Sequence, residues 1–255
     1  MALWKQVIQQ LFHLVGYHLY PKDTRPVLRH DMERDKTFMH LYSQCNEYTM
    51  TTMERLFMLH KAVQHVVERN IQGDWVECGV WRGGSAMMIA LTLKELGRTQ
   101  DNIYLFDTYE GMPEPTPEDR RYNGSDSRIS WEKAQRESHN SWCFASLDDV
   151  QENMRKTAYA AEHLHFIKGK VQDTLTTSAP KSIALLRLDT DWYASTKHEL
   201  HVLYPMLSQG GILILDDYGE WEGVRQATDE YFASLGKDAP MLHRIDCACY
   251  MAVKP

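Results

Sequence analysis

The chain has 255 residues, of which 43% are hydrophobic and 25% are charged, and its 28 Lys and Arg against 35 Asp and Glu give a formal net charge of −7. Seven Trp and thirteen Tyr beside only nine Pro exclude intrinsic disorder and indicate an ordinary globular protein. A chain of this length buries roughly 70–75% of its unfolded surface, so it needs no disulfide or structural metal to fold. The acidic balance also argues against a nucleic-acid partner, which would select a basic surface.

The cysteines and the apolar segments bear on the cellular compartment. The chain has an odd number of cysteines, namely Cys45, Cys78, Cys143, Cys247 and Cys249. No two of them have the C-x-x-C spacing. This spacing does not suit a zinc or redox site, so we expect reduced thiols and a cytoplasmic protein. No transmembrane segment is predicted, and residues 1–20 lack the small-residue cleavage site of a secretory signal.

The first 47 residues are predicted to form a helical extension. In residues 1–20 one apolar stripe recurs at helical spacing, made of Leu3, Trp4, Val7, Ile8, Leu11, Phe12 and Val15. Packing of this stripe on the body or on a second subunit is favoured over a membrane surface, because the polar side carries few basic residues. We therefore expect a homo-oligomer, at least a dimer. A connecting arm follows, with one short helix over residues 31–45.

A longer helix is predicted from Thr51 to Asn70, where Thr51 and Glu54 have the spacing of a capping box. After Gly73 apolar runs predict strands over residues 75–80, 103–106, 165–167, 183–188 and 212–215, and helical patterns cover 85–96, 147–160, 196–207 and 223–234. This alternation predicts a doubly wound, mostly parallel sheet with helices on both faces. Ligands of such sheets bind at the carboxyl ends of the strands. The polar segment 107–142 is expected to cover that edge.

The first strand runs into a glycine-rich turn, Glu77-Cys78-Gly79-Val80-Trp81-Arg82-Gly83-Gly84-Ser85, and the second ends in Asp107. Glycine allows a tight turn and lets a ligand approach the backbone amides, although a purely structural turn remains an alternative. The spacing differs from the G-x-G-x-x-G of dinucleotide enzymes. Asp107 could cap the next turn or bind the two hydroxyls of a ribose, so the pair favours an adenosine-type ligand. Modification of Cys78 inside the turn is expected to impair ligand binding.

The fourth and fifth strands end in acidic clusters, Asp189-Thr190-Asp191 and Asp216-Asp217. If these strands are neighbours, their carboxylates converge at one edge, which is costly unless they share protons or a cation. A set of oxygen ligands without a nearby cysteine favours a hard divalent ion such as Mg²⁺. The alternative is that Asp191 caps the following helix and Asp217 faces solvent.

Four ordered motifs resemble the macrocin O-methyltransferase family, whose members methylate sugar hydroxyls. They are residues 75–85, Leu105-Phe106-Asp107-Thr108-Tyr109-Glu110-Gly111-Met112-Pro113, Leu186-Arg187-Leu188-Asp189-Thr190-Asp191 and Asp216-Asp217-Tyr218. The resemblance implies a class I methyltransferase domain over residues 48–255, built on a Rossmann-like seven-stranded sheet whose last strand is antiparallel. It also implies S-adenosylmethionine as the methyl donor and Mg²⁺ as the activator.

The resemblance further implies a role for individual residues. The donor's methionine end would be held by Glu77 and Gly79, its ribose by Asp107 and its adenine by Gln172, with Trp81, Gly83 and Ser85 in the same binding loop and Thr49 and Met50 closing over it. Asp189, Asp216 and Asp217 would bind the metal, and Asp191 would accept the proton of the hydroxyl. Residues 1–47 and 114–141 match no motif, so the acceptor, a sugar or another vicinal diol on a small molecule or a glycan, stays open.

Other classes of protein share parts of this pattern. Asp189 and Asp191 have the D-x-D spacing of metal-dependent glycosyltransferases, which do not need the glycine-rich turn after the first strand. Phosphatases of the haloacid dehalogenase type also use D-x-D, but they expect a small residue where this chain has Tyr193. A non-catalytic protein that binds S-adenosylmethionine on the same fold is the third alternative.

Overall fold

The computed structural model describes residues 30–255. These residues belong to two compact units, of which one ends at Met39 and the other is His40–Pro255. The helix expected in residues 1–20 lies outside the described residues. Its expected role in self-association therefore stays a prediction. The helix expected over residues 31–45 is two helices, α2 (His30–Arg34) and α3 (Lys36–Cys45), because the carboxylate of Asp35 accepts the N–H of Phe38 and starts a new helix.

A seven-stranded sheet forms the centre of the second unit, in the order β3-β2-β1-β4-β5-β7-β6. Its strands are β1 (Asp74–Cys78), β2 (Ile103–Asp107), β3 (Leu164–Lys168), β4 (Ile183–Leu188), β5 (Leu207–Leu215), β6 (His243–Arg244) and β7 (Tyr250–Val253). The first five strands are parallel, whereas β7 lies antiparallel between β5 and β6. The strand order reverses between β1 and β4, so the doubly wound fold class is confirmed.

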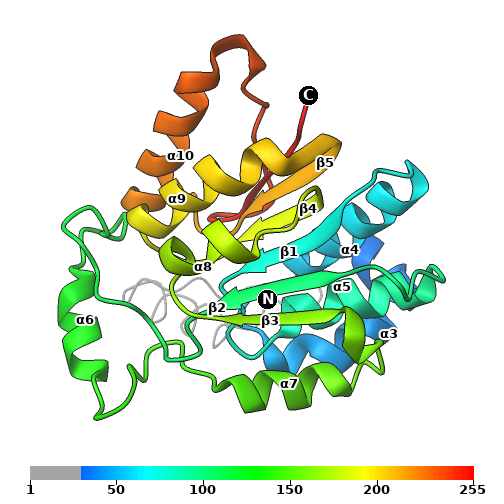
Figure 1. Cartoon of the computed structure of the whole chain (residues 1–255), viewed down its shortest axis with the longest axis horizontal. Coiled ribbons are helices and arrows are strands. Elements are labelled where there is room, and N and C mark those ends of the chain that lie inside the picture. Colours follow the sequence, from blue (N-terminus) through cyan, green and yellow to red (C-terminus); the bar gives the residue numbers. More distant parts are fainter. Residues whose placement is uncertain (1–29) are drawn as a thin grey trace, which may run out of the picture. The chain divides into compact units, whose positions relative to one another are not determined.

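Helices cover both faces of this sheet. Figure 1 shows α8 (Val171–Ser178), α9 (Tyr193–Leu203) and α10 (Glu222–Leu235) in front of it, with α4 (Met53–Glu68) and α5 (Gly84–Glu95) behind. Every residue of β4 is buried, as expected for a central parallel strand covered on both faces. Among residues 30–255 no helix combines the length and the hydropathy that a membrane crossing requires.

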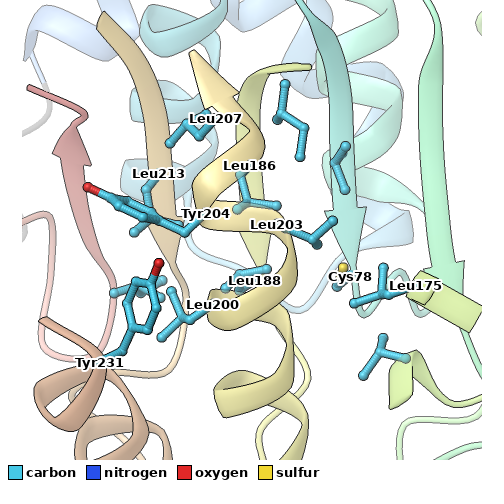
Figure 2. Close-up of a cluster of buried hydrophobic side chains, with 14 of the residues drawn as sticks. Cys78, Leu175, Leu186, Leu188, Leu200, Leu203, Tyr204, Leu207, Leu213 and Tyr231 are labelled. Atoms are coloured by element: carbon cyan, nitrogen blue, oxygen red, sulfur yellow. The ribbon is translucent and has the colours of Figure 1, made fainter. Parts of the chain in front are cut away.

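The main hydrophobic core lies between β4, β5 and the front helices. In Figure 2 Leu200 and Leu203 of α9 lie against Leu186 and Leu188 of β4. Cys78 belongs to the same core and has no exposed surface. Its thiol lies in the core, so a reagent reaches it only if the end of β1 opens, and the expected effect of its modification on ligand binding stays a prediction.

Two local predictions also need correction. The N-cap of α4 is Thr52, not Thr51, and its hydroxyl accepts the N–H of Arg55 at 3.2 Å. No capping box forms, because the third helical position holds Arg55 and not Glu54. Between β2 and α7 (Leu147–Arg155), the polar segment expected to cover the strand ends, for which no helix was predicted, contains the helix α6 (Ser127–Ala134), capped by Asp126.

Candidate active site

A cavity of about 540 Å³ lies at the carboxyl ends of the parallel strands, within the size range of small-molecule sites. Most of the residues expected to form the site line it: Met50, Gly79, Trp81, Asp107, Gln172, Asp189, Asp191, Asp216 and Asp217. Their elements are far apart in sequence. The sheet brings them together because β1, β2, β4 and β5 all end at this edge.

The glycine-rich turn joins the ends of two strands. Gly79 has a φ of +84°, and a Cβ built on it would lie 1.8 Å from the carbonyl oxygen of Asp189. Only glycine therefore allows the end of β1 to pack this closely against the end of β4. A Cβ on Gly84, at the start of α5, would likewise clash with the backbone of Tyr48 and the side chain of Thr49. The turn is thus structural as well as cavity-lining.

Four of the expected donor-binding residues do not line the cavity. Glu77 is only 1% exposed and its Oε1 accepts a hydrogen bond from Arg187 at 2.6 Å. Ser85 is buried in α5, and Gly83 is the N-cap of that helix. The hydroxyl of Thr49 accepts the N–H of Thr51 at 3.1 Å. Their assignment to donor binding stays a prediction.

Asp107 organises the turn from the neighbouring strand. Its Oδ2 accepts the N–H groups of Val80 at 2.7 Å and Trp81 at 3.1 Å, while its Oδ1 accepts that of Tyr109 at 2.8 Å. Burial raises the pKa of this carboxyl, although these amide donors act in the opposite direction. The carboxylate therefore braces a turn, and it also lines the cavity. Its binding of a ribose stays a prediction.

The acidic residues after β4 and β5 converge on one point. Asp189, Asp216 and Asp217 each offer a carboxylate oxygen, and these oxygens all lie within 4.8 Å of one another. Asp217 Oδ2 is buried and has no hydrogen-bond partner among the described residues. Burial, followed by the charges of Asp191 and Asp189, raises the pKa of Asp217 well above its usual value. A buried oxygen without a partner, surrounded by like charges, fits a divalent cation at this point.

Two arginines partly compensate this charge. Arg187 donates from Nη1 to Asp189 and from Nη2 to Asp216, both at 2.7 Å, in addition to its bond with Glu77. Arg55, from α4, donates from Nη1 to Asp216 Oδ2 at 2.5 Å and from Nε to Asp246 at 2.7 Å. Neither arginine was expected in the site. Arg187 could have been identified, because a charge inside a buried apolar strand must be paired, whereas no sequence signal marks Arg55.

The sequence left open that Asp191 caps the next helix, and the structure shows that it does not. The first N–H of α9, from Tyr193, is donated to Asp119 Oδ1 at 2.7 Å. Asp191 instead has a φ of +63° and its Oδ1 accepts the indole N–H of Trp221 at 2.8 Å. Burial and then the charge of Asp189 raise the pKa of Asp191 to about 7. Such a carboxyl can accept a proton near neutral pH.

Aromatic and apolar residues form the remaining wall. Met112, Pro113, Cys143 and Trp192 line the cavity beside the acidic cluster. The rings of Trp192 and Trp221 meet edge to face with centroids 5.0 Å apart. Met112 and Pro113 belong to the second sequence motif, whereas Cys143 and Trp192 lie outside the four motifs.

The fold and the site together define a class I methyltransferase. The chain is similar to the solved structure of the O-methyltransferase NovP, with 31% identity, a TM-score of 0.71 and coverage of 81% of this chain and 82% of NovP. The calicheamicin methyltransferase CalS11 has the same fold, with a TM-score of 0.62 at 16% identity over 99% of this chain and 93% of CalS11.

The chain belongs to the macrocin O-methyltransferase (TylF) family, whose model matches residues 22–253. It is 33% identical over 194 residues to a tetracenomycin 4′-O-methyltransferase of Streptomyces olivaceus, covering 76% of this chain and 71% of that protein. It is also 33% identical over 190 residues to the demethyldecarbamoylnovobiocin O-methyltransferase of Streptomyces niveus, covering 74% and 70%. The chain is therefore an O-methyltransferase, and the glycosyltransferase and phosphatase alternatives are set aside. Membership in a methyltransferase family implies S-adenosylmethionine as the donor.

Proposed function

We propose that this enzyme transfers a methyl group from S-adenosylmethionine to a hydroxyl of a sugar, with Mg²⁺ bound by Asp189, Asp216 and Asp217. The observation that carries the proposal is the convergence of these three carboxylates, with Asp191 beside them, on the wall of one cavity. Gly79 and Trp81 of the glycine-rich turn, Asp107 and Gln172 line the same cavity.

The donor is proposed to lie along the ends of β1 and β2. Gly79, Trp81 and Asp107 line this part of the cavity, Gln172 lies at the start of α8, and Met50 lines it from the segment before α4. In the proposed orientation the adenosine side lies over β2 and the methionine side lies towards β4. The positive sulfonium then faces the acidic cluster, which stabilises it electrostatically.

The chemistry needs an aligned and deprotonated hydroxyl. Mg²⁺ bound to the three carboxylates would lower the pKa of an acceptor hydroxyl. Asp191 accepts the hydroxyl proton, the oxygen bonds to the methyl carbon, and the carbon–sulfur bond breaks to leave neutral S-adenosylhomocysteine. The cavity wall next to Asp191 is apolar and aromatic, which suits the carbon face of a sugar.

The acceptor is proposed to be a sugar carried by a small molecule. Support comes from the names of the relatives, which describe methylation of a rhamnosyl tetracenomycin and, in a third relative of 30% identity from Micromonospora griseorubida, of mycinamicin III. A panel of deoxysugar glycosides, tested with labelled donor and Mg²⁺, identifies the acceptor. If no sugar hydroxyl in a broad panel is methylated, with or without Mg²⁺, the proposed acceptor class is wrong.

The metal assignment is tested best at Asp217. Replacing Asp216 would remove a carboxylate partner from both Arg187 and Arg55 and would disturb the fold as well as the site, whereas Asp217 forms no ion pair with a described residue. Asp217→Asn is expected to lower Mg²⁺-dependent turnover by about 100-fold or more, since a metal ligand is lost. The affinity for S-adenosylhomocysteine, measured by calorimetry, should change little.

Asp229→Asn is the matched control, because Asp229 lies on the exposed side of α10 and contacts Tyr218 at 2.7 Å. It should keep both turnover and calorimetric Mg²⁺ binding. Unchanged Mg²⁺ binding and turnover in Asp217→Asn would show that the cation is not held there.

A further inference from the structure

Trp221 makes a specific contact with the candidate base. It precedes α10 as its N-cap residue, is 3% exposed, and donates its indole N–H to Asp191 Oδ1 at 2.8 Å. The ring cannot turn freely, because the edge-to-face contact with Trp192 holds one side and the Arg121 guanidinium lies 4.8 Å from its centroid. The direction of the N–H donor is therefore fixed by packing.

Asp191 needs such a partner. Its left-handed backbone, with a φ of +63°, is unusual for a residue with a side chain. The other groups that act on its carboxyl are acidic, namely Asp189, Asp217 and Asp216. The indole N–H of Trp221 is a neutral donor, and its hydrogen bond fixes the direction of the Asp191 carboxyl beside these like charges.

We propose that Trp221 is a positioning residue for Asp191. Its indole N–H holds one carboxyl oxygen, so that the other oxygen is presented to the acceptor hydroxyl. The inference rests on the proposed function, in which Asp191 accepts the proton. It adds a residue outside the four sequence motifs, and it links the aromatic wall of the cavity to the reacting groups.

Trp221→Phe tests this role, because phenylalanine keeps an aromatic ring and removes the donor. We expect kcat to fall by about 10- to 100-fold, a part of the contribution of a general base. The KM for the glycoside and the affinity for S-adenosylhomocysteine should stay within about threefold, since the binding walls are unchanged. A merely structural role would instead lower the melting temperature and change KM and donor affinity together with kcat.

Trp75→Phe is the matched control. Its indole N–H also bonds to a carboxylate, Asp101 Oδ2 at 3.2 Å, but at the opposite end of β1 from the cavity. The two variants lose the same kind of hydrogen bond at the two ends of the sheet. We expect Trp75→Phe to keep kcat, whatever its effect on the melting temperature.

A nuclear magnetic resonance measurement tests the contact without turnover. In ¹⁵N-labelled protein the Trp221 indole signal is identified by its loss in Trp221→Phe. Asp191→Asn should shift this signal clearly and leave that of Trp75 in place.

The outcomes separate the two proposals. A kcat within twofold of wild type in Trp221→Phe, or an indole signal that Asp191→Asn does not move, overturns the positioning role. A wild-type protein that binds no S-adenosylhomocysteine overturns the proposed function instead, and the indole shift then still reports whether Trp221 contacts Asp191.

Discussion

A buried arginine balances the negative charges at the ends of β4 and β5. Arg187 has its guanidinium between Glu77, Asp189 and Asp216, and it is almost fully buried. Removing one partner of such a buried pair costs about 3–5 kcal/mol, because the remaining charge stays without compensation. Arg187 therefore compensates part of the charge of these three carboxylates, and the proposed cation would compensate the charge at Asp217.

The buried carboxyl of Glu199 is expected to make the free energy of unfolding depend on pH. This residue of α9 has no exposed surface; its Oε2 accepts the hydroxyl of Thr190 at 3.1 Å, and its Oε1 has no hydrogen-bond partner among the described residues. Burial raises the pKa of Glu199 from 4.5 to about 8. Between these values the folded state binds a proton that the unfolded state lacks, so the contribution of Glu199 to stability is fully present below about pH 4.5 and is lost as pH rises to about 8.

Glu199→Gln should remove this dependence, since glutamine keeps an acceptor for Thr190 and does not titrate. Urea unfolding from pH 5 to 8 should show wild type losing up to about 1.4 kcal/mol per pH unit relative to the variant. Glu222→Gln, at an exposed position of α10, is the control and should keep the wild-type slope. Parallel slopes for wild type and Glu199→Gln would contradict the raised pKa.

At the scale of elements, the site depends on how closely two strands end beside each other. The turn after β1 meets the turn after β4 at Gly79, where no side chain fits. The Asp107 carboxylate then binds the two amides that follow. These contacts hold the glycine-rich turn and the acidic turn as one rigid unit, which explains why the cavity lies at this edge.

Gly79→Ala is therefore expected to be more harmful than an ordinary glycine substitution. Gly97 supplies the comparison, because it has a similar φ of +71° but its Cβ would meet no atom within 4 Å. The backbone conformation alone costs about 1 kcal/mol or somewhat more in both variants. The clash with Asp189 should add about 1–3 kcal/mol in Gly79→Ala. Urea unfolding measures both variants, and equal losses of stability would show that the close approach is not important.

At the scale of the whole molecule, much of the fold could be predicted because buried parallel strands are apolar throughout. The five parallel strands gave clear apolar runs, but β6 has two exposed residues, His243 and Arg244, and leaves no such signal. The acidic residues of the cavity could be predicted from the sequence, because Asp189 and Asp216 directly follow apolar strands. Arg55 and Trp221 could not, because they reach the site from α4 and from the start of α10 through tertiary packing.

The same packing predicts how the five thiols react. Cys45, Cys78 and Cys249 are fully buried, Cys247 is exposed, and Cys143 lies partly buried on the cavity wall. Burial raises the pKa of the Cys143 thiol, so little reactive thiolate forms there. In native protein we expect Cys247 to react quickly with a thiol reagent and Cys143 slowly, while the other three react only on unfolding.

S-adenosylhomocysteine should slow the reaction of Cys143 further and leave Cys247 unchanged, since a molecule bound in the cavity restricts access only to Cys143. Mass spectrometry of the labelled peptides over time distinguishes the five sites. Cys143→Ser removes the slow native phase and serves as the control. Rapid labelling of Cys78 in native protein would show that the end of β1 opens to solvent, and that its thiol is not held in the core as the structure has it.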